Sequence, residues 1–347
     1  MTCSVYVHVP FCDHICYYCG FFRRANHTEK RQAWLDKMCE TARNTEFPDH
    51  LETLYFGGGT PSVLTLEELG RLRDCFPASV GEFTMEANPD GVTRKKAQAW
   101  HDLGINRISL GVQSFDDDML AKIGRHHTAQ QAEEAIEELK AAGISNLSID
   151  LIYGLPGQTL DQVQADVERF LKLDIGHLSI YSLQIEENSV FGRQHIASCD
   201  EDLEADMYEW ICARLKKAGY DHYEISSFAR GDRHSRHNLV YWQDEDFKGL
   251  GPGAAGRENG QRYHIDEQWI RINEETDAPF EAIMMGLRTR FGIDLDAYET
   301  KYGINILDTY ETVLERWKAY FRTDQRRLYL TEQGREVLNT ILLDFMD

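Results

Sequence analysis

The sequence predicts an α/β fold, a partial (βα)6 barrel of the TIM type followed by a small, mainly helical C-terminal domain. Six strand-like runs, rich in β-branched and aromatic residues, begin near positions 4, 53, 82, 107, 146 and 177. A helical pattern follows each run, and right-handed crossovers then curl a parallel sheet into a closed or partial barrel. Several runs are apolar almost throughout, as expected when both faces of a sheet are covered.

Start signals mark two of the predicted barrel helices. Thr65 is followed by Glu68, and Thr159 is followed by Gln162. Both pairs fit a capping box, in which two side chains satisfy backbone amides that the first helical turn leaves without partners. We therefore expect a helix to begin at each pair.

Changes of pattern divide the chain into three segments. Residues 1–232 are expected to form the barrel, residues 233–264 a loop-like linker, and residues 265–347 the C-terminal domain. The last segment reads as helices that end in a short strand and a final helix.

The charge and hydropathy of the chain exclude two classes of partner. The 347 residues include 37 Lys and Arg against 58 Asp and Glu, a net charge of −21, which repels nucleic acid and anionic lipid surfaces. No apolar run reaches the ~18 residues of a membrane span, and no basic and apolar leader precedes the first strand. We expect a cytoplasmic protein with no nucleic-acid partner and no membrane span.

Three of the eight cysteines, Cys12, Cys16 and Cys19, lie within eight positions at the spacing C-x3-C-x2-C. A structural zinc site needs four protein ligands, and a disulfide needs two thiols in an oxidising compartment. Three thiolates suit a 4Fe-4S cluster in which one iron has no protein ligand and is free to bind a chelating small molecule. Zinc with His8 or His14 as the fourth ligand is the alternative that the spacing leaves open.

Unusual residues gather directly after five of the predicted strands. The segments are "PFCDHICYYC", "GGGTPS", "EANP", "GVQSF" and "DLIYGLPGQ". Any one of them alone is typical of a turn. In a parallel barrel, however, chemistry takes place at the C-terminal ends of the strands, so the five together predict one site at one mouth.

The cysteine spacing after a first barrel strand, with Tyr18 just before the third cysteine, resembles the radical S-adenosylmethionine (SAM) superfamily. Further motifs resemble the branch that contains oxygen-independent coproporphyrinogen III dehydrogenases and HemW heme chaperones: "YVHVPFC", "FGGGTPS", "MEANP", "RISLGVQSF", "LIYGLPGQT", "YEISSFA" and "HNLVYW". The resemblance covers nearly the whole chain and implies a barrel of the radical SAM kind.

The resemblance also implies which residues bind the cofactors. A 4Fe-4S cluster would sit on the three cysteines, and its open iron would chelate the amino and carboxylate groups of SAM. The residues carried over to SAM are Tyr6 and Tyr18 beside the cofactor, Gly58, Gly59 and Thr60 beside its methionine part, Glu86 near the amino group, Arg125 near the carboxylate, and Gln113 and Asp150 near the ribose. Glycine would let the backbone approach the ligand, and charge-assisted hydrogen bonds would orient the zwitterion.

Each of these assignments has a structural alternative. Glu86 and Arg125 could form an ion pair that only supports the fold, and Asp150 could cap a helix or a turn. The five strand-end motifs together favour the cofactor interpretation.

The C-terminal segment resembles the small C-terminal domain of the same branch, which looks like a winged helix. Residues 265–347 hold 10 Lys and Arg against 17 Asp and Glu, a net charge of −7, so the basic surface that DNA binding requires is missing. We expect a lid or an interaction module.

A glycine motif in the linker carries no nucleotide site. "GPGAAG" at 251–256 fits G-x-G-x-x-G, but Pro252 interrupts it and no long strand or crossover helix frames it. Many related proteins carry a histidine where this chain has Ala255, so the role of that histidine is in doubt here.

Two functions share the barrel and cluster in this branch: radical oxidative decarboxylation of coproporphyrinogen III, and delivery of heme to heme proteins. Three features favour the heme chaperone: only eleven residues precede Cys12, Phe21 stands where the dehydrogenase has another cysteine, and "HNLVYW" is present. "CGF" at 19–21 favours the dehydrogenase. A third hypothesis, a non-enzymatic cluster carrier, does not explain the intact SAM residues.

The motif "HNLVYW" supplies the implied heme contacts. His237 resembles the family's heme-contacting histidine, and Tyr241 and Trp242 would stack on the macrocycle; an ordinary hydrogen-bonded histidine is the alternative. The expected partners are heme or a related porphyrin, heme-accepting proteins such as respiratory enzymes, and an electron donor such as flavodoxin or ferredoxin. A homodimer is compatible with the sequence.

We predict that anaerobically purified protein is brown and binds about four irons per chain on Cys12, Cys16 and Cys19, because three thiolates complete the protein ligand set of such a cluster. Metal analysis by mass spectrometry checks this. Stoichiometric zinc without iron would contradict it.

Overall fold

A nine-stranded, mostly parallel sheet forms the barrel of this computed structural model, which describes residues 3–324 and 326–346. The six predicted parallel strands are confirmed, and they lie side by side in chain order: β1 (Ser4–Val9), β4 (His50–Gly58), β5 (Ser79–Ala87), β6 (Arg107–Gln113), β7 (Asn146–Tyr153) and β8 (His177–Ser182). After β8 the sheet continues with two antiparallel strands, β10 (Ser227–Ala229) and then β9 (Asp221–Glu224).

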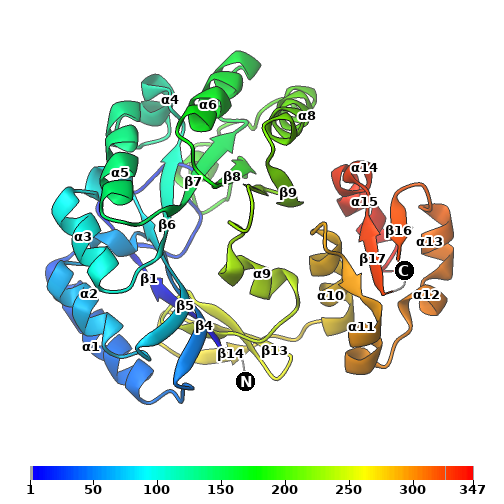
Figure 1. Cartoon of the computed structure of the whole chain (residues 1–347), viewed down its shortest axis with the longest axis horizontal. Coiled ribbons are helices and arrows are strands. Elements are labelled where there is room, and N and C mark those ends of the chain that lie inside the picture. The colour runs from blue at the N-terminus through cyan, green and yellow to red at the C-terminus, as the bar shows by residue number, and fades with distance from the viewer. Residues whose placement is uncertain (1–2, 325, 347) are drawn as a thin grey trace.

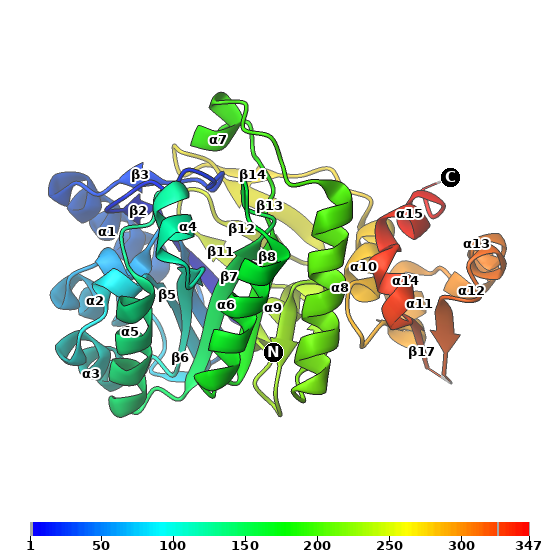
Figure 2. The same cartoon turned by 90° about the horizontal axis from the view of Figure 1, so that it is seen from above.

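Helices cover the outer face of the sheet in an arc (Figure 1) and run along the strands (Figure 2). They are α1 (Thr28–Arg43), α2 (Leu66–Arg73), α3 (Arg94–Asp102), α5 (Ala129–Ala141), α6 (Leu160–Lys172) and α8 (Glu201–Lys217), with the short helices η1 (Pro61–Val63), η2 (Pro89–Gly91), α4 (Asp117–Lys122) and α7 (Val190–Arg193) in loops. Their apolar faces bury Leu35, Trp100 and Phe170 against the sheet, so the main core lies outside the barrel, between sheet and helices.

Capping boxes start the helices where the sequence predicts them. The Thr65 side chain accepts a hydrogen bond from the Glu68 N–H, the Glu68 side chain accepts one from the Thr65 N–H, and Thr159 and Gln162 repeat the pattern at α6. A third box, unpredicted, begins α5 at Thr128.

The segment expected to be a loop-like linker is instead part of the barrel and of a small neighbouring sheet. It contains α9 (Arg236–Trp242), β11 (Lys248–Leu250), β12 (Ala255–Glu258) and most of β13 (Gln261–Ile265), which pairs with β14 (Arg271–Asn273). β11 pairs in parallel with β1 and so satisfies the edge of the main sheet. Strands this short leave no periodic signal in a sequence.

The C-terminal domain has its own hydrophobic core, which includes Ile283, Leu287, Leu328 and Ile341. Its elements are the helices α10 (Ala278–Leu287), α11 (Leu295–Tyr302), α12 (Ile306–Thr309), α13 (Glu311–Arg316), α14 (Glu332–Glu336) and α15 (Leu338–Leu343), and the antiparallel strands β15 (Ile293–Asp294), β17 (Arg327–Leu330) and β16 (Phe321–Thr323). Helices around a small sheet agree with the predicted domain type. No helix in the described part of the chain is both long and apolar enough to cross a membrane.

A chain of hydrogen bonds ties the cysteine loop to the helices behind it. Glu68 of α2 accepts two bonds from Arg31 Nε at 3.0 and 2.9 Å, and Arg31 Nη1 donates to Asn26 Oδ1 at 2.6 Å. Asn26 in turn donates to Asp13 Oδ1 at 2.7 Å, and its backbone N–H donates to Cys12 O. The short pair β2 (Phe11–Cys12) and β3 (Arg24–Ala25) is fixed in this way.

We predict that Arg31→Ala lowers the free energy of unfolding by about 3 kcal/mol, because it leaves the buried Glu68 carboxylate without its cation. Urea unfolding measures this. The matched control is Arg71→Ala, which removes an exposed ion pair with Asp36 and should leave the free energy of unfolding almost unchanged. Equal losses for the two variants would contradict a supporting role for the buried pair.

Candidate functional site

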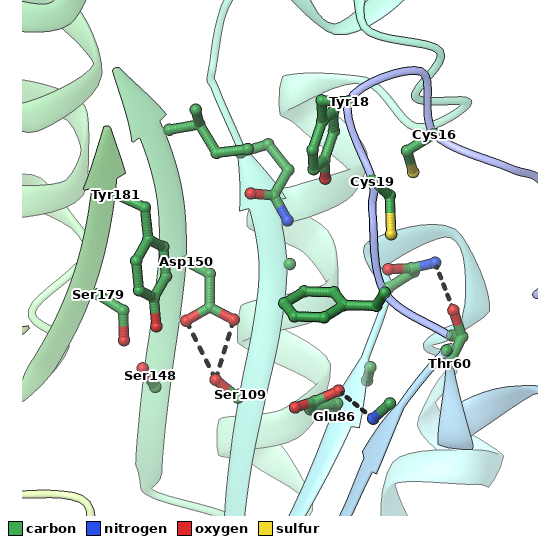
Figure 3. A pocket seen from close by; sticks show the side chains of 18 of the residues that line it. Cys16, Tyr18, Cys19, Thr60, Glu86, Ser109, Ser148, Asp150, Ser179 and Tyr181 are labelled. Atoms are coloured by element: carbon green, nitrogen blue, oxygen red, sulfur yellow. Dashed lines mark hydrogen bonds between the residues drawn. The ribbon is translucent and has the colours of Figure 1, made fainter. Parts of the chain in front are cut away.

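A cavity of about 630 Å³ runs from the C-terminal mouth of the barrel down its interior to the start of α9. Its walls come from β4 to β8, its rim from the cysteine loop and the glycine loop, and its floor includes Ser235 and Asn238. Figure 3 shows polar side chains that converge on this space from both sides. The five strand-end segments therefore meet at one mouth, as the sequence predicts.

All three cysteines of the motif line this cavity. Cys12 lies at the end of β2, where Thr60 Oγ1 donates to its Sγ at 3.5 Å, while Cys16 and Cys19 stand on the loop at the rim (Figure 3). Burial raises the pKa of the Cys12 thiol to about 11. Metal binding at this position must therefore displace a proton.

The zinc alternative with His8 or His14 finds no support in the geometry. His8 contacts the Tyr6 hydroxyl through Nδ1 at 3.1 Å and the Phe22 carbonyl through Nε2 at 2.9 Å, so both ring nitrogens are occupied. His14 stacks on His126 with ring centroids 3.7 Å apart. Within residues 3–324 and 326–346 no three Cys, His, Asp or Glu side chains converge on a single ion position. Separate thiols suit a cluster, in which each thiolate holds a different iron.

Arg125 places a positive charge beside the cysteine loop. Its Nη1 donates to Cys16 Sγ at 3.3 Å, and its Nη2 donates to Asn88 Oδ1 at 2.9 Å and to the Gly111 carbonyl. The buried Nε has no hydrogen-bond partner among the described residues, and none of these contacts is a carboxylate. A buried cation without a counterion is costly, so an anionic group in this cavity would be stabilised.

The glycine loop after β4 packs tightly against β1 and the residues that follow it. Gly58 has φ +112°, and a Cβ there would lie 2.6 Å from the His8 ring; a Cβ on Gly59 would lie 2.8 Å from the Phe11 carbonyl oxygen. The close approach that requires glycine is thus made to the protein's own strand. Gly58 and Gly59 also line the cavity, so their expected approach to a ligand stays a prediction. Thr60 follows on the cavity side.

Gln113 reaches the cavity because of a local irregularity in β6. The pairing of β6 with β7 shifts between Gly111 and Gln113, and Gln113 has φ +71°, an uncommon value for a residue with a side chain. A bulge of this kind re-aims a side chain at the end of a strand. Gln113 consequently lines the mouth beside Arg125.

Two carboxyl groups face the barrel interior. Tyr55 OH donates to Glu86 Oε1 at 2.8 Å and Gly58 N–H to Oε2 at 3.0 Å, while Ser109 Oγ donates to both oxygens of Asp150 at 3.1 and 3.0 Å (Figure 3). Burial raises the pKa of Glu86 to about 7, with a contribution from the nearby Asp150, and burial raises the pKa of Asp150 to about 6. Among the described residues neither group has a cation at hydrogen-bonding distance, so both can accept hydrogen bonds from a ligand.

Polar residues at every second position point inward from four neighbouring strands. Most of them were not predicted from the sequence as site residues. They are Thr84 and Glu86 of β5, Arg107 and Ser109 of β6, Ser148 and Asp150 of β7, and His177, Ser179 and Tyr181 of β8. We interpreted these strands as apolar on both faces, which is wrong for the inner face. The signal was present, because a period of two separates the faces of a strand.

The two tyrosines expected near SAM lie at different depths. Tyr18 lines the cavity at the rim, and burial raises its pKa well above the usual value, so its hydroxyl stays protonated. Tyr6 lies behind the lining, where its ring stacks on Tyr55 at 5.8 Å and on His237 at 6.2 Å.

His237 does not reach the cavity surface. It is fully buried in α9, where Nδ1 lies 2.6 Å from Thr53 Oγ1 and Nε2 lies 2.6 Å from Tyr241 OH. Burial lowers its pKa to about 3, so the ring is neutral. Trp242 is half-buried at the end of the helix. The structure brings the cluster candidates and the SAM candidates other than Tyr6 together around the cavity, but the heme candidates are absent from its lining.

The residues present fit the two cofactors that the sequence resemblance implies. The three thiols would hold the cluster, which supplies an open iron for SAM and an electron for its cleavage. Arg125 would face the SAM carboxylate, Glu86 its amino group and Asp150 its ribose hydroxyls. The cavity volume lies in the ~300–1,000 Å³ range of sites for one small molecule.

Models of known families match most of the chain. The radical SAM superfamily matches residues 6–170, and the HemN C-terminal domain matches residues 273–337. The first match runs from β1 into α6, and the second runs from β14 to the end of α14.

Individual relatives cover the chain almost completely. A heme chaperone HemW of Lactococcus lactis is 38% identical over 99% of this chain and 97% of its own length, and one of Bacillus subtilis is 34% identical over 99% of both. A solved structure of the Escherichia coli coproporphyrinogen III oxidase HemN covers 99% of this chain and 90% of its own with a TM-score of 0.84 at 21% identity, which establishes a shared fold.

We predict that SAM affinity rises up to about tenfold between pH 6 and pH 8, because Glu86 must be ionised to accept hydrogen bonds from the ligand's amino group and the Glu86 carboxyl is mostly protonated below its pKa of about 7. Titration calorimetry on the cluster-loaded protein measures it. Glu86→Gln should bind SAM more weakly and lose most of the pH dependence, whereas Glu134→Gln, exposed on α5, should behave as wild type. A wild-type affinity independent of pH would contradict the assignment of Glu86.

Proposed function

The chain belongs to the radical SAM superfamily and, within it, to the family of heme chaperone HemW proteins, and from this premise we propose that it binds heme and delivers it to heme proteins. The observation that carries the proposal is the 38% identity to a heme chaperone over nearly the full length of both chains. The similarity spans both the barrel and the C-terminal domain.

A 4Fe-4S cluster on Cys12, Cys16 and Cys19 and a SAM molecule below it complete the proposed state. The orphaned Nε of the buried Arg125 and the two uncompensated carboxyl groups support this, because together they match a ligand with one carboxylate and positively charged groups.

Coproporphyrinogen III dehydrogenase activity is the alternative, and the similarity to heme chaperones weighs against it. The relatives that are 38% and 34% identical over nearly the whole chain are both named heme chaperones. The similarity to HemN, at 21% identity, concerns the fold alone.

Contacts of His237, Tyr241 and Trp242 with heme stay a prediction. In the present conformation they would require α9 to move, because both nitrogens of His237 are already in hydrogen-bonding contact with protein groups and its side chain is fully buried. Leaving two buried polar partners unpaired would cost about 1–3 kcal/mol each.

Heme-accepting proteins, an electron donor such as flavodoxin or ferredoxin, a homodimer and a cytoplasmic location likewise stay predictions. A large negative charge is compatible with a protein that avoids lipid and nucleic acid. The C-terminal domain, with its separate core, is a suitable module for contact with an acceptor.

We predict that the reconstituted protein binds heme and does not decarboxylate coproporphyrinogen III. Anaerobic heme titration followed in the Soret band, with a parallel assay for SAM-dependent release of carbon dioxide, checks both parts. The controls are heme titrated into buffer without protein and into an unrelated acidic protein. Release of carbon dioxide with formation of protoporphyrinogen would assign the dehydrogenase function, and heme binding no tighter than that of the acidic control would remove the chaperone function.

A further inference from the structure

A groove on the outer side of the barrel, beside the cysteine loop, is separate from the barrel cavity. It has a volume of about 750 Å³, and its walls come from the β2 and β3 pair, one face of α1 and the turn before β14. Figure 2 shows β2 and β3 beside α1. Pro10 and Phe11 line the groove, and Cys12 is the next residue in the chain. Because the two cavities share no lining residue, an occupant of the groove would lie beside the cluster loop and leave the barrel mouth open.

The charge of this groove is opposite to that of the whole protein. Arg24, Lys30 and Lys37 line it, and Glu267 is the single carboxylate in its lining, in a chain of net charge −21. Lys30 and Lys37 lie on one face of α1, since residues seven apart are two turns along the same side of a helix. Arg24 and Glu267 are both exposed and pair at 3.3 Å, and exposed pairs of this kind are weak. The groove is thus a basic patch on an acidic protein.

Apolar side chains stand beside these cations. Phe21, three residues before β3, is 73% exposed, and Ile270, in the turn before β14, is 53% exposed. The turn is fixed by Asp266, whose carboxylate accepts a hydrogen bond from the Ile270 N–H at 2.8 Å. Trp269 lines the groove, and Lys37 Nζ lies 5.5 Å from its ring centroid. Exposed apolar side chains with a charged rim are typical of a surface that contacts another protein.

A short path through two aromatic side chains joins the groove to the first cluster ligand. Trp34 of α1 lines the groove, and its ring packs edge to face on Phe11 with the ring centroids 5.8 Å apart. Phe11 is covalently bonded to Cys12. Electron transfer slows steeply with distance, so a redox group seated at this groove would be well placed to exchange an electron with a cluster on the cysteines.

We propose that this groove docks a small acidic electron-transfer protein, which passes one electron to the oxidised cluster. The proposal rests on the cluster-bound state under the proposed function and deepens it by naming the surface that receives the reductant. The donor loses one electron and the cluster gains it, so no bond forms or breaks and no further reactant is needed. Transient redox complexes of this kind use small interfaces, and complementary charges speed their association.

The charge distribution favours this partner over the others that a basic patch attracts. Two acidic proteins repel each other, so an acidic donor needs a local basic patch in order to approach this chain. A small donor meets mainly the groove, because charges more than about 10 Å away are screened at moderate salt. An extended lipid surface or nucleic acid would also face the acidic surroundings of the groove and would be repelled.

Binding of an acidic flavodoxin to the cluster-loaded, full-length protein tests the proposal. The charge reversal Lys30→Glu with Lys37→Glu should weaken flavodoxin binding about tenfold or more at low salt, as measured by titration calorimetry, and should slow reduction of the cluster by reduced flavodoxin to a similar degree. Ile270→Ser should weaken binding by a smaller factor. Added salt should weaken binding to the wild type but not to the charge-reversed variant, because only the wild type gains from opposite charges.

Two controls separate docking from damage to the protein. Lys95→Glu with Lys217→Glu, exposed on α3 and α8, changes the net charge equally and should bind flavodoxin within about twofold of the wild type. Iron content, the thermal midpoint and SAM affinity should be the same in all variants. Reduction of the cluster by photoreduced deazaflavin, a small molecule that needs no docking surface, should also be unchanged.

The outcomes separate this surface from the proposed function. Wild-type flavodoxin affinity and reduction rate in the charge-reversed variant overturn the surface, whatever a parallel heme titration shows. Loss of binding to vesicles of anionic phospholipid in that variant, with flavodoxin binding retained, also overturns it, because the groove would then serve a lipid surface. Charge-sensitive flavodoxin binding in a protein that binds no heme removes the heme function and leaves the surface. A protein that takes up no iron removes both.

Discussion

The buried guanidinium of Arg125 is the interaction on which the site depends. It joins the cysteine loop through Cys16, the end of β5 through Asn88 and the end of β6 through the Gly111 carbonyl. Neutral acceptors and a thiol offset only part of the cost of burying this cation. Negative charge added beside Arg125 would therefore stabilise the mouth of the barrel. Thiolates at a cluster and a ligand carboxylate both provide such charge, and both positions lie within reach of the same side chain.

Deeper in the barrel, two of the buried ionisable groups are carboxyl groups. Glu86 and Asp150 lie on the inner face, and burial raises the pKa of both. A ligand with a carboxylate near Arg125 and an amino group near Glu86 would relieve the charge imbalance at both side chains. The cavity would thus orient a zwitterion by electrostatics, while the Ser109 hydroxyl holds the Asp150 oxygens in place.

Helix α9 separates the interior of the barrel from the rest of the chain. His237 anchors it to β4 through Thr53, its backbone N–H donates to Glu82 of β5, and Asn238 contributes to the cavity floor. The partial barrel, open between β9 and β11, would otherwise expose its polar inner face.

The sequence by itself determined the six β/α units, the capping boxes at Thr65 and Thr159 and the cysteine triad, because these depend on local periodicity and fixed spacing. The family motifs further indicated the residues around the barrel mouth. Only the tertiary structure decided which face of each strand turns inward, that His237 is enclosed by Thr53 and Tyr241, and that residues 23–37 meet Trp269 across a cavity. Such pairings join segments far apart in the chain, and their cost or benefit depends on burial, which no local pattern of residues records.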